Sequence, residues 1–132
     1  MKKTMTLVAI CAALVCMYMI PTLNASEAPA DMVLAMPEGQ TATKAPVDFS
    51  HAAHGDLDCV DCHHKWDGAA EVTKCSSEGC HTNYTAKKGA DSFYAAFHTR
   101  SNEASCLGCH AALKTAGEAT GPTGCADCHP AE

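Results

Sequence analysis

The sequence has few of the side chains that build a hydrophobic core. Aromatic residues make up 5% of its 132 residues, and only six of them lie beyond residue 25. These six are Phe49, Trp66, Tyr84, Phe93, Tyr94 and Phe97. Much of the other apolar content is alanine and cysteine. A small chain with so little bulky side chain needs disulfides, metals or a large cofactor in its interior.

Basic residues are also scarce. Beyond residue 25, seven Lys and Arg stand against fifteen Asp and Glu, which gives a formal net charge of −8. Nucleic acid is therefore excluded as a partner, because its phosphates are bound by clustered positive charge.

One long apolar run is present, and it is at the start of the chain. Lys2 and Lys3 precede 16 apolar-rich residues from Met5 to Ile20, and Ala25 ends a Leu-Asn-Ala sequence. This order is typical of a secretory signal peptide at residues 1–25, cleaved after Ala25. As a helix the run would be about 24 Å long, shorter than a hydrocarbon core of about 30 Å, which disfavours a permanent span. The remaining 107 residues suit one domain.

The exported part divides into an arm and a domain. Residues 26–46 contain three prolines and no cysteine or histidine, so we expect an N-terminal arm that takes no part in a site. Within it, residues 32–36 are a short extended candidate that we expect to pair with residues 46–49 as a small β-hairpin. Residues 47–132 form the predicted domain, in which cysteine and histidine clusters recur.

Two stretches have helical spacing. In residues 91–98, Phe93 and Phe97 are four residues apart. Residues 103–114 place Cys106, Cys109 and His110 on one helical face together with a leucine. The glycines and proline of residues 117–124 predict a loop. The expected fold is mainly α with long loops and a small N-terminal β-hairpin.

The cysteines and histidines form repeated motifs. C-x-x-C-H occurs three times, at Cys59, Cys62 and His63, at Cys106, Cys109 and His110, and at Cys125, Cys128 and His129. A wider C-x-x-x-x-C-H occurs at Cys75, Cys80 and His81. C-x-x-C-H is the attachment signature of c-type haem, in which the thiols form thioethers and the histidine is the proximal iron ligand. Four such motifs in an exported chain predict four haems c.

The residue counts agree with this interpretation. Two of the ten cysteines lie in the signal segment, which leaves two thiols for each haem. Four of the eight histidines lie outside the motifs, and these candidate sixth ligands are His51, His54, His64 and His98. Met32 and Met36, the only methionines beyond the signal, precede the first motif. The sequence therefore predicts four bis-histidine haems.

Other uses of these residues stay open. Four-cysteine zinc sites share the C-x-x-C spacing, but zinc does not require a histidine directly after the second cysteine. Four disulfides would suit a small exported domain, but they leave the histidines unexplained. Any one of His51, His54 or His98 is also compatible with an ordinary surface position.

Bis-histidine ligation has functional consequences. Both axial positions of each iron are filled by protein, which favours electron transfer over substrate chemistry, and without a methionine ligand the potentials should be low. His63 and His64 are adjacent, and neighbouring side chains cannot approach one iron along the same axis. We therefore expect these two histidines to ligate different haems.

The motifs together resemble a known family. "VDFSHAAH", "CVDCHH", "CSSEGCH", "CLGCH" and the aromatic residues before His98 are similar to the tetrahaem cytochrome c3 group of class III c-type cytochromes. The resemblance runs from Val47 to His129 and implies the haem-packed fold of that family. It also implies an electron carrier, not an enzyme, in the periplasm of a sulfate-reducing bacterium, relaying electrons between redox proteins in anaerobic sulfate respiration.

The resemblance further implies the ligand pairs. They would be His63 with His51, His81 with His64, His110 with His54, and His129 with His98. His51 and His54, on one turn, would thus serve two irons, and Phe49 would pack among the first haems.

Two features differ from the common basic members of that family. The fourth motif, "CADCH", lacks their usual wider spacing, and Lys114 is the only basic residue in residues 111–132. Together with the net charge, this implies the acidic type II branch, which exchanges electrons with a basic cytochrome c3 and is associated with transmembrane redox complexes. Hydrogenase is a weaker candidate partner. The alternatives are a small multihaem reductase of metal ions or oxyanions, and a fixed subunit of a membrane complex.

Overall fold

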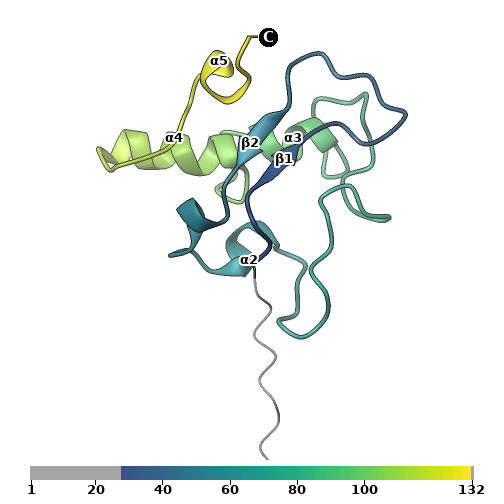
Figure 1. Cartoon of the computed structure of the whole chain (residues 1–132), viewed down its shortest axis with the longest axis horizontal. Coiled ribbons are helices and arrows are strands. Elements are labelled where there is room, and N and C mark those ends of the chain that lie inside the picture. Colours follow the sequence, from purple (N-terminus) through teal and green to yellow (C-terminus); the bar gives the residue numbers. More distant parts are fainter. Residues whose placement is uncertain (1–27, 132) are drawn as a thin grey trace, which may run out of the picture.

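The computed structural model describes residues 28–131, so the predicted signal peptide lies outside the described residues. In chain order the elements are β1 (Met32–Leu34), β2 (Val47–Phe49), the 3-10 turn η1 (Ala52–His54), α2 (Cys59–Cys62), α3 (Phe93–His98), α4 (Cys106–Ala116) and α5 (Cys125–Cys128). Loops connect these short elements over most of the chain (Figure 1). The fold is thus mainly α with long loops, as predicted, and its sheet has two strands.

The two strands pair as the sequence predicts. β1 and β2 are antiparallel, with Leu34 opposite Val47 and Met32 opposite Phe49. In β2 the half-buried Val47 and Phe49 alternate with the exposed Asp48, as the two-residue period of a strand predicts, whereas in β1 only Leu34 is half-buried. The pairing holds the N-terminal arm against the segment that leads into η1.

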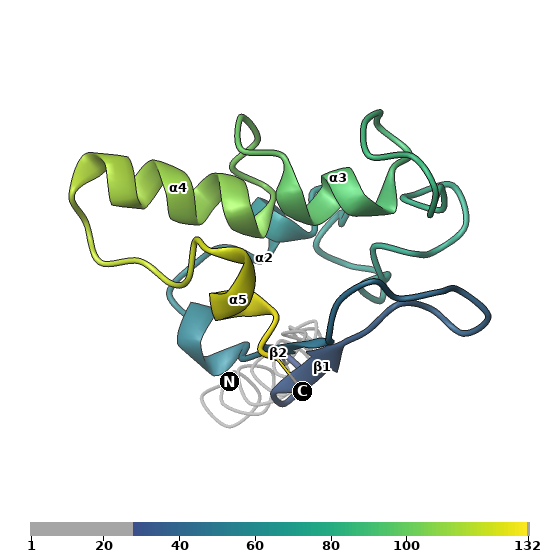
Figure 2. The ribbon, with the colours of Figure 1, turned by 90° about the horizontal axis from the view of Figure 1, so that it is seen from above.

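Helices α3 and α4 follow each other along one side of the molecule (Figures 1 and 2). Each begins at a serine whose hydroxyl accepts a backbone N–H, Ser92 from Ala95 at 3.1 Å and Ser105 from Gly108 at 3.0 Å. α4 ends at Gly117, whose φ of 78° is left-handed and stops the helix. α3 lies within the first stretch for which the sequence predicts helical spacing, and α4 begins within the second stretch and continues two residues beyond it.

The described residues contain no hydrophobic core. None of their hydrophobic side chains is fully buried, and the only fully buried side chains are Ser92 and Ser105. Viewed from above, α3 and α4 lie on one side, with the hairpin and α5 on the other (Figure 2). A chain arranged in this way needs a large non-protein group to fill its interior, in line with the haems that the sequence predicts.

Ser105 connects the end of α3 to the start of α4 through hydrogen bonds, and we expect Ser105→Ala to destabilise the protein. Its hydroxyl lies 2.8 Å from the carbonyl oxygen of Thr99 and 2.9 Å from that of Asn102, in addition to capping α4. Losing these bonds inside the protein should cost about 1 to 3 kcal/mol and lower the melting temperature. Ser101→Ala, at an exposed position of the same turn, is the control. Equal melting temperatures for the two variants would contradict this role.

We also expect the chain to lose its tertiary structure when haem attachment is prevented. Ordering each residue costs about 1 to 2 kcal/mol, and the half-buried apolar side chains offset too little of that cost. The chain produced without haem should show a random-coil circular dichroism spectrum and poorly dispersed amide resonances. A compact apoprotein with a cooperative melting transition would show that the polypeptide folds by itself.

Candidate functional site

Each C-x-x-C-H motif folds as a short helical turn. The amide of His63 donates to the carbonyl of Cys59 at 2.8 Å, and that of His129 donates to the carbonyl of Cys125 at 2.9 Å. Residues i, i+3 and i+4 of such a turn project to the same side, so both thiols and the imidazole can reach one flat group.

The third motif forms the first turn of α4. Cys106 is the first residue of the helix, and the amide of Cys109 donates to the carbonyl of Ser105 at 3.0 Å. Cys109 and His110 are half-buried, whereas Cys106 is exposed. The structure therefore places Cys109 on the same turn as the other two residues of its motif, and α4 holds all three in one rigid segment.

Two of the turns are capped by an aspartate inside the motif. Asp61, in "CVDC", accepts a hydrogen bond from the amide of Asp58 at 3.2 Å, and Asp127, in "CADC", accepts one from Gly124 at 3.2 Å. Each carboxylate thereby satisfies an amide at the start of a four-residue helix that is too short to be stable alone. Sequence reasoning missed this role, although the shared C-x-D-C pattern could have indicated it.

The wider second motif closes with a different turn. The amide of His81 donates to the carbonyl of Cys75 at 2.9 Å, across two additional residues. Gly79 accommodates them with a φ of 78°, a left-handed conformation that favours glycine. Cys80 and His81 are thus returned to the neighbourhood of Cys75.

The eight cysteines differ in their exposure. Three of them are half-buried, namely Cys80, Cys109 and Cys128, and each is the second cysteine of its motif. The other five are exposed, namely Cys59, Cys62, Cys75, Cys106 and Cys125. All eight are free, so no disulfide is formed in residues 28–131. Free thiols that are still accessible in the folded chain are compatible with attachment to a cofactor and exclude the disulfide alternative from this structure.

Thiols from different motifs lie near one another. Partial desolvation raises the pKa of Cys62, and the neighbouring Asp61, Cys109 and Cys75 raise it further. Desolvation also raises the pKa of Cys106, with Cys62, Cys75 and Cys128 adding to the effect. A raised pKa keeps these groups as neutral thiols in the chain without a cofactor. The same direction holds for Cys75 and Cys128, again because of desolvation.

The histidine rings face one another in pairs. The ring centres of His54 and His110 are 6.1 Å apart with planes 12° from parallel, and those of His98 and His129 are 6.1 Å apart at 13°. The rings of His64 and His81 are 5.9 Å apart at 47°. These pairs join residues that are distant in the sequence, and they correspond to three of the four pairs that the resemblance implies.

His51 and His63 are the remaining two histidines, and they also lie close together. Desolvation is the larger cause that lowers the pKa of His63, and the neighbouring His51 lowers this pKa further, so the neutral imidazole is favoured. Neutral imidazole is the form that binds a metal. His51 and His54 lie on the single turn of η1, so one turn contributes to two histidine pairs.

Backbone carbonyls fix the orientation of four of the rings. The Nδ1 atoms of His54, His98, His110 and His129 lie 2.8, 2.9, 2.9 and 2.6 Å from the carbonyl oxygens of Ser50, Tyr94, Pro122 and Ala45, respectively. Because a carbonyl only accepts, each Nδ1 must donate, which leaves the lone pair on Nε2 for a metal. This tautomer is the one that an iron ligand requires.

One of these carbonyls belongs to the N-terminal arm. The sequence predicts that residues 26–46 take no part in the site, but the carbonyl of Ala45 accepts the hydrogen bond of His129, 84 residues away. The pattern of cysteines and histidines gives no signal for a backbone group, which explains why sequence reasoning missed this contribution.

The arrangement fits haems better than the alternatives. Metal–imidazole bonds of about 2 Å on both sides of one iron bring two ring centres to roughly 6 Å apart, close to the separations observed. In residues 28–131, no three His, Cys, Asp or Glu side chains gather around a point where they could hold a single metal ion.

Aromatic side chains pack against three of the histidine rings. Phe49 lies 4.8 Å from both His51 and His54, measured between ring centres, in accord with the expectation that it packs beside the first haems. Tyr94 stacks on His98 at 4.2 Å with planes 8° apart. Both aromatics restrict the rotation of the imidazoles that they contact.

Known proteins share both the sequence and the fold. Residues 28–129 match the Class III cytochrome C family. Cytochrome c3 of Maridesulfovibrio salexigens is 64% identical over 107 residues, 79% of this chain and 96% of that relative. Cytochrome c3 of Desulfovibrio desulfuricans is 55% identical over 104 residues, 79% and 97% of the two chains.

Among solved structures, the di-tetraheme cytochrome c3 from Desulfovibrio gigas has a TM-score of 0.72 at 39% identity, over 79% of this chain and 98% of that one. Within residues 28–131, the structure has no helix long and apolar enough to cross a membrane. The sequence motifs, the fold and these similarities agree: the chain belongs to the class III cytochrome c family, as a multihaem electron-transfer protein of the cytochrome c3 type with four haems c.

Proposed function

We propose that the protein is a periplasmic carrier of low-potential electrons whose four haems each have two histidine ligands. The observation that carries this proposal is the pairwise arrangement of the imidazoles, three pairs of which have ring centres 5.9 to 6.1 Å apart. The export signal and the resemblance to the periplasmic family support the location. The same resemblance supports a role in sulfate respiration.

The proposed ligands follow from the motifs and the ring pairs. For haems one to four, thioethers would form at Cys59 and Cys62, at Cys75 and Cys80, at Cys106 and Cys109, and at Cys125 and Cys128. The axial pairs would be His63 with His51, His81 with His64, His110 with His54, and His129 with His98 in the same order. Residues 47–132 would then form the haem domain, with residues 26–46 as an arm that pairs one strand with it.

The proposed carrier function follows from how the chain would ligate the irons and how it orients the histidine rings. Bound haem supplies a one-electron couple at each iron. The chain would fill both axial positions of each iron, and it orients four of the eight rings through Nδ1, which makes these imidazoles stronger donors and favours low potentials. A reductase of metal ions or oxyanions would instead need one iron with a labile ligand.

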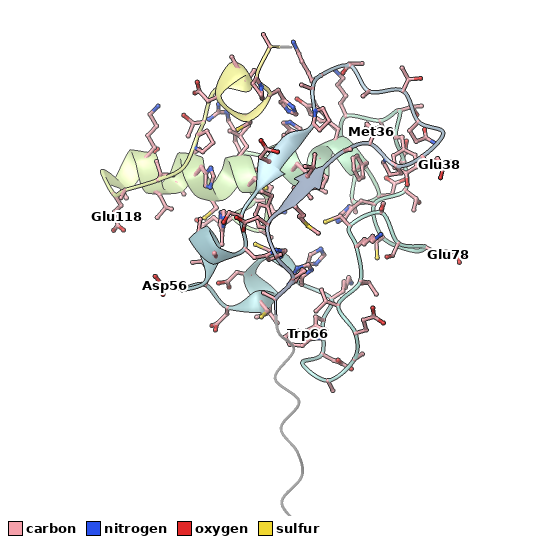
Figure 3. All side chains as sticks on the ribbon, in the orientation of Figure 1. Met36, Glu38, Asp56, Trp66, Glu78 and Glu118 are labelled. Carbon is pink, nitrogen blue, oxygen red and sulfur yellow. The ribbon has the colours of Figure 1, made fainter. Side chains whose placement is uncertain are left out.

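The distribution of charge supports a basic redox partner. Asp56, Asp58 and Asp61 alternate along the sequence with Leu57 and Val60, which are 47% and 48% exposed, at the first haem motif. We call these five residues the acidic face. No Lys or Arg lies between residues 45 and 64, and Asp56 projects outward at the margin of the molecule (Figure 3).

Two exposed apolar side chains with carboxylates next to them in the sequence suit a transient encounter with a positively charged protein. We therefore propose exchange with a basic cytochrome c3, as in the acidic type II branch, and delivery to a transmembrane redox complex. Hydrogenase is the weaker candidate donor, because residues 111–132, which include the fourth motif, have Lys114 as their only Lys or Arg.

Replacement of His64 tests the ligand pairs. The native protein should have an entirely low-spin spectrum. In His64→Ala the haem at Cys75 and Cys80 should become high spin while the other three stay low spin, because the ring of His64 faces His81 and not its neighbour His63. Electron paramagnetic resonance and visible spectra measure the spin states.

His98→Ala is the matched control, since it should convert the fourth haem instead. Damage to the first haem in His64→Ala would contradict the proposed pairs. A high-spin haem in the native protein would favour the reductase.

Neutralisation of the acidic face tests the partner. Replacing its three aspartates by asparagine should slow reduction by a basic cytochrome c3 roughly tenfold at low salt. The native rate should also fall as ionic strength rises from about 0.01 to 0.15 M, where the Debye length shortens from roughly 30 to 8 Å. Stopped-flow absorbance measures both rates, and asparagine retains an oxygen to cap α2.

The control has the same change in charge elsewhere, with the exposed residues Glu71, Glu78 and Glu103 replaced by glutamine. Equal slowing in the two triple variants would mean that net charge, and not the acidic face, determines the rate.

A further inference from the structure

The loop after α4 returns to the imidazole of His110 and contacts it through three consecutive residues. The hydroxyl of Thr120 donates to the carbonyl of His110 at 3.1 Å. The carbonyl of Pro122 accepts from Nδ1 of His110 at 2.9 Å. Between them, the backbone of Gly121 lies directly against the ring.

Gly121 is a glycine because of this close approach. A Cβ at this position would lie 2.5 Å from Cε1 of the His110 ring and 3.0 Å from both ring nitrogens, closer than real Cβ contacts allow. Its φ is not in the left-handed range, so a left-handed backbone is not the reason for glycine at this position. Among the glycines of residues 28–131, it is the only one whose added Cβ would meet a histidine ring.

Gly117, in the same loop, has the opposite properties. Its φ of 78° is left-handed, and nothing lies within 4 Å of where its Cβ would be. Alanine at Gly117 would therefore strain the end of α4 without touching His110, whereas alanine at Gly121 would press on the ring without occupying a left-handed backbone. The loop thus contains its own matched control.

We propose that Thr120, Gly121 and Pro122 form a clamp that fixes the tilt and rotation of the His110 imidazole and so tunes the reduction potential of the third haem. This inference rests on the proposed assignment of His110 and His54 to that haem. The three residues act through His110, so they are positioning residues.

The ring has little freedom to move away from an added methyl group. Its backbone belongs to α4 and is also held by Thr120, and its Nδ1 is held by Pro122. In the haem protein its Nε2 is the proposed iron ligand. Either the imidazole tilts, which weakens its ligation, or the loop withdraws, which breaks the hydrogen bond to Nδ1 and makes the imidazole a poorer donor. Both changes raise the potential of this haem.

The test compares Gly121→Ala with Gly117→Ala in the fully haem-loaded protein. Gly121→Ala should shift the paramagnetic NMR haem-methyl signals and the g-values of one haem out of four, and should raise the potential of that haem. Gly117→Ala should lower the melting temperature and leave all four sets of haem signals in place. Unchanged third-haem signals in Gly121→Ala, or the same shift in both variants, would overturn the clamp.

Two further variants keep the result interpretable. Thr120→Val removes the hydroxyl bond without adding bulk, so it should shift the same haem by a smaller amount even if Gly121→Ala is produced poorly. Absence of a third-haem shift in Thr120→Val would then count against the clamp. His54→Ala identifies the third haem independently. If His54→Ala and the clamp variants perturb different haems, the proposed pairing of His110 with His54 is wrong. If His54→Ala perturbs a haem and the clamp variants perturb none, the clamp is wrong and the pairing stands.

Discussion

The facing imidazole pairs are the constraint on which the rest of the structure depends. His54 and His110, like His98 and His129, come from segments far apart in the sequence, yet each pair has ring centres 6.1 Å apart. Since no hydrophobic side chain of the described residues is fully buried, apolar packing alone does not set the positions of η1, α3, α4 and α5. Under the proposed ligation, the requirement that two rings meet across each haem sets them instead. Such a fold is held by contacts at defined points between short elements, and not by a continuous hydrophobic core.

The long loops have a structural role in this arrangement because they deliver carbonyl groups. The carbonyls of Ala45 and Pro122 orient rings that lie on other segments, and those of Ser50 and Tyr94 orient rings one turn along the chain. An imidazole that donates through Nδ1 is fixed in tautomer and in rotation, and both properties matter to an iron ligand. A loop that places one carbonyl correctly therefore contributes as much to the site as the histidine that it holds.

Sequence reasoning reached the parts of the site that side-chain identity encodes. The four motifs, the eight histidines and the two helical stretches are visible because cysteine, histidine and aromatic residues are distinctive at fixed spacing. The carbonyls were not predictable, because every residue has one and only the fold decides which carbonyl meets a ring. Ala45 illustrates this, since it lies in a segment without cysteine or histidine. In the sequence Gly121 is an ordinary loop glycine, and its contact with His110 depends on the return of the loop to α4.

The doubled histidine of "CVDCHH" depends on where a helix ends. At His63 the backbone has φ −88° and ψ 57°, so α2 stops and the chain turns before His64. The two adjacent rings consequently face different partners, His63 lying near His51 and His64 facing His81. In the third motif the helix continues past His110, and the next residue is Ala111, which has no ligating group. A second ligand directly after the motif can therefore serve another haem only where the helical turn ends at the motif. In α4 the helix continues, so both side chains would stay on one rigid segment. Under the proposed ligand pairs, the early end of α2 allows one dipeptide to contribute ligands to two haems.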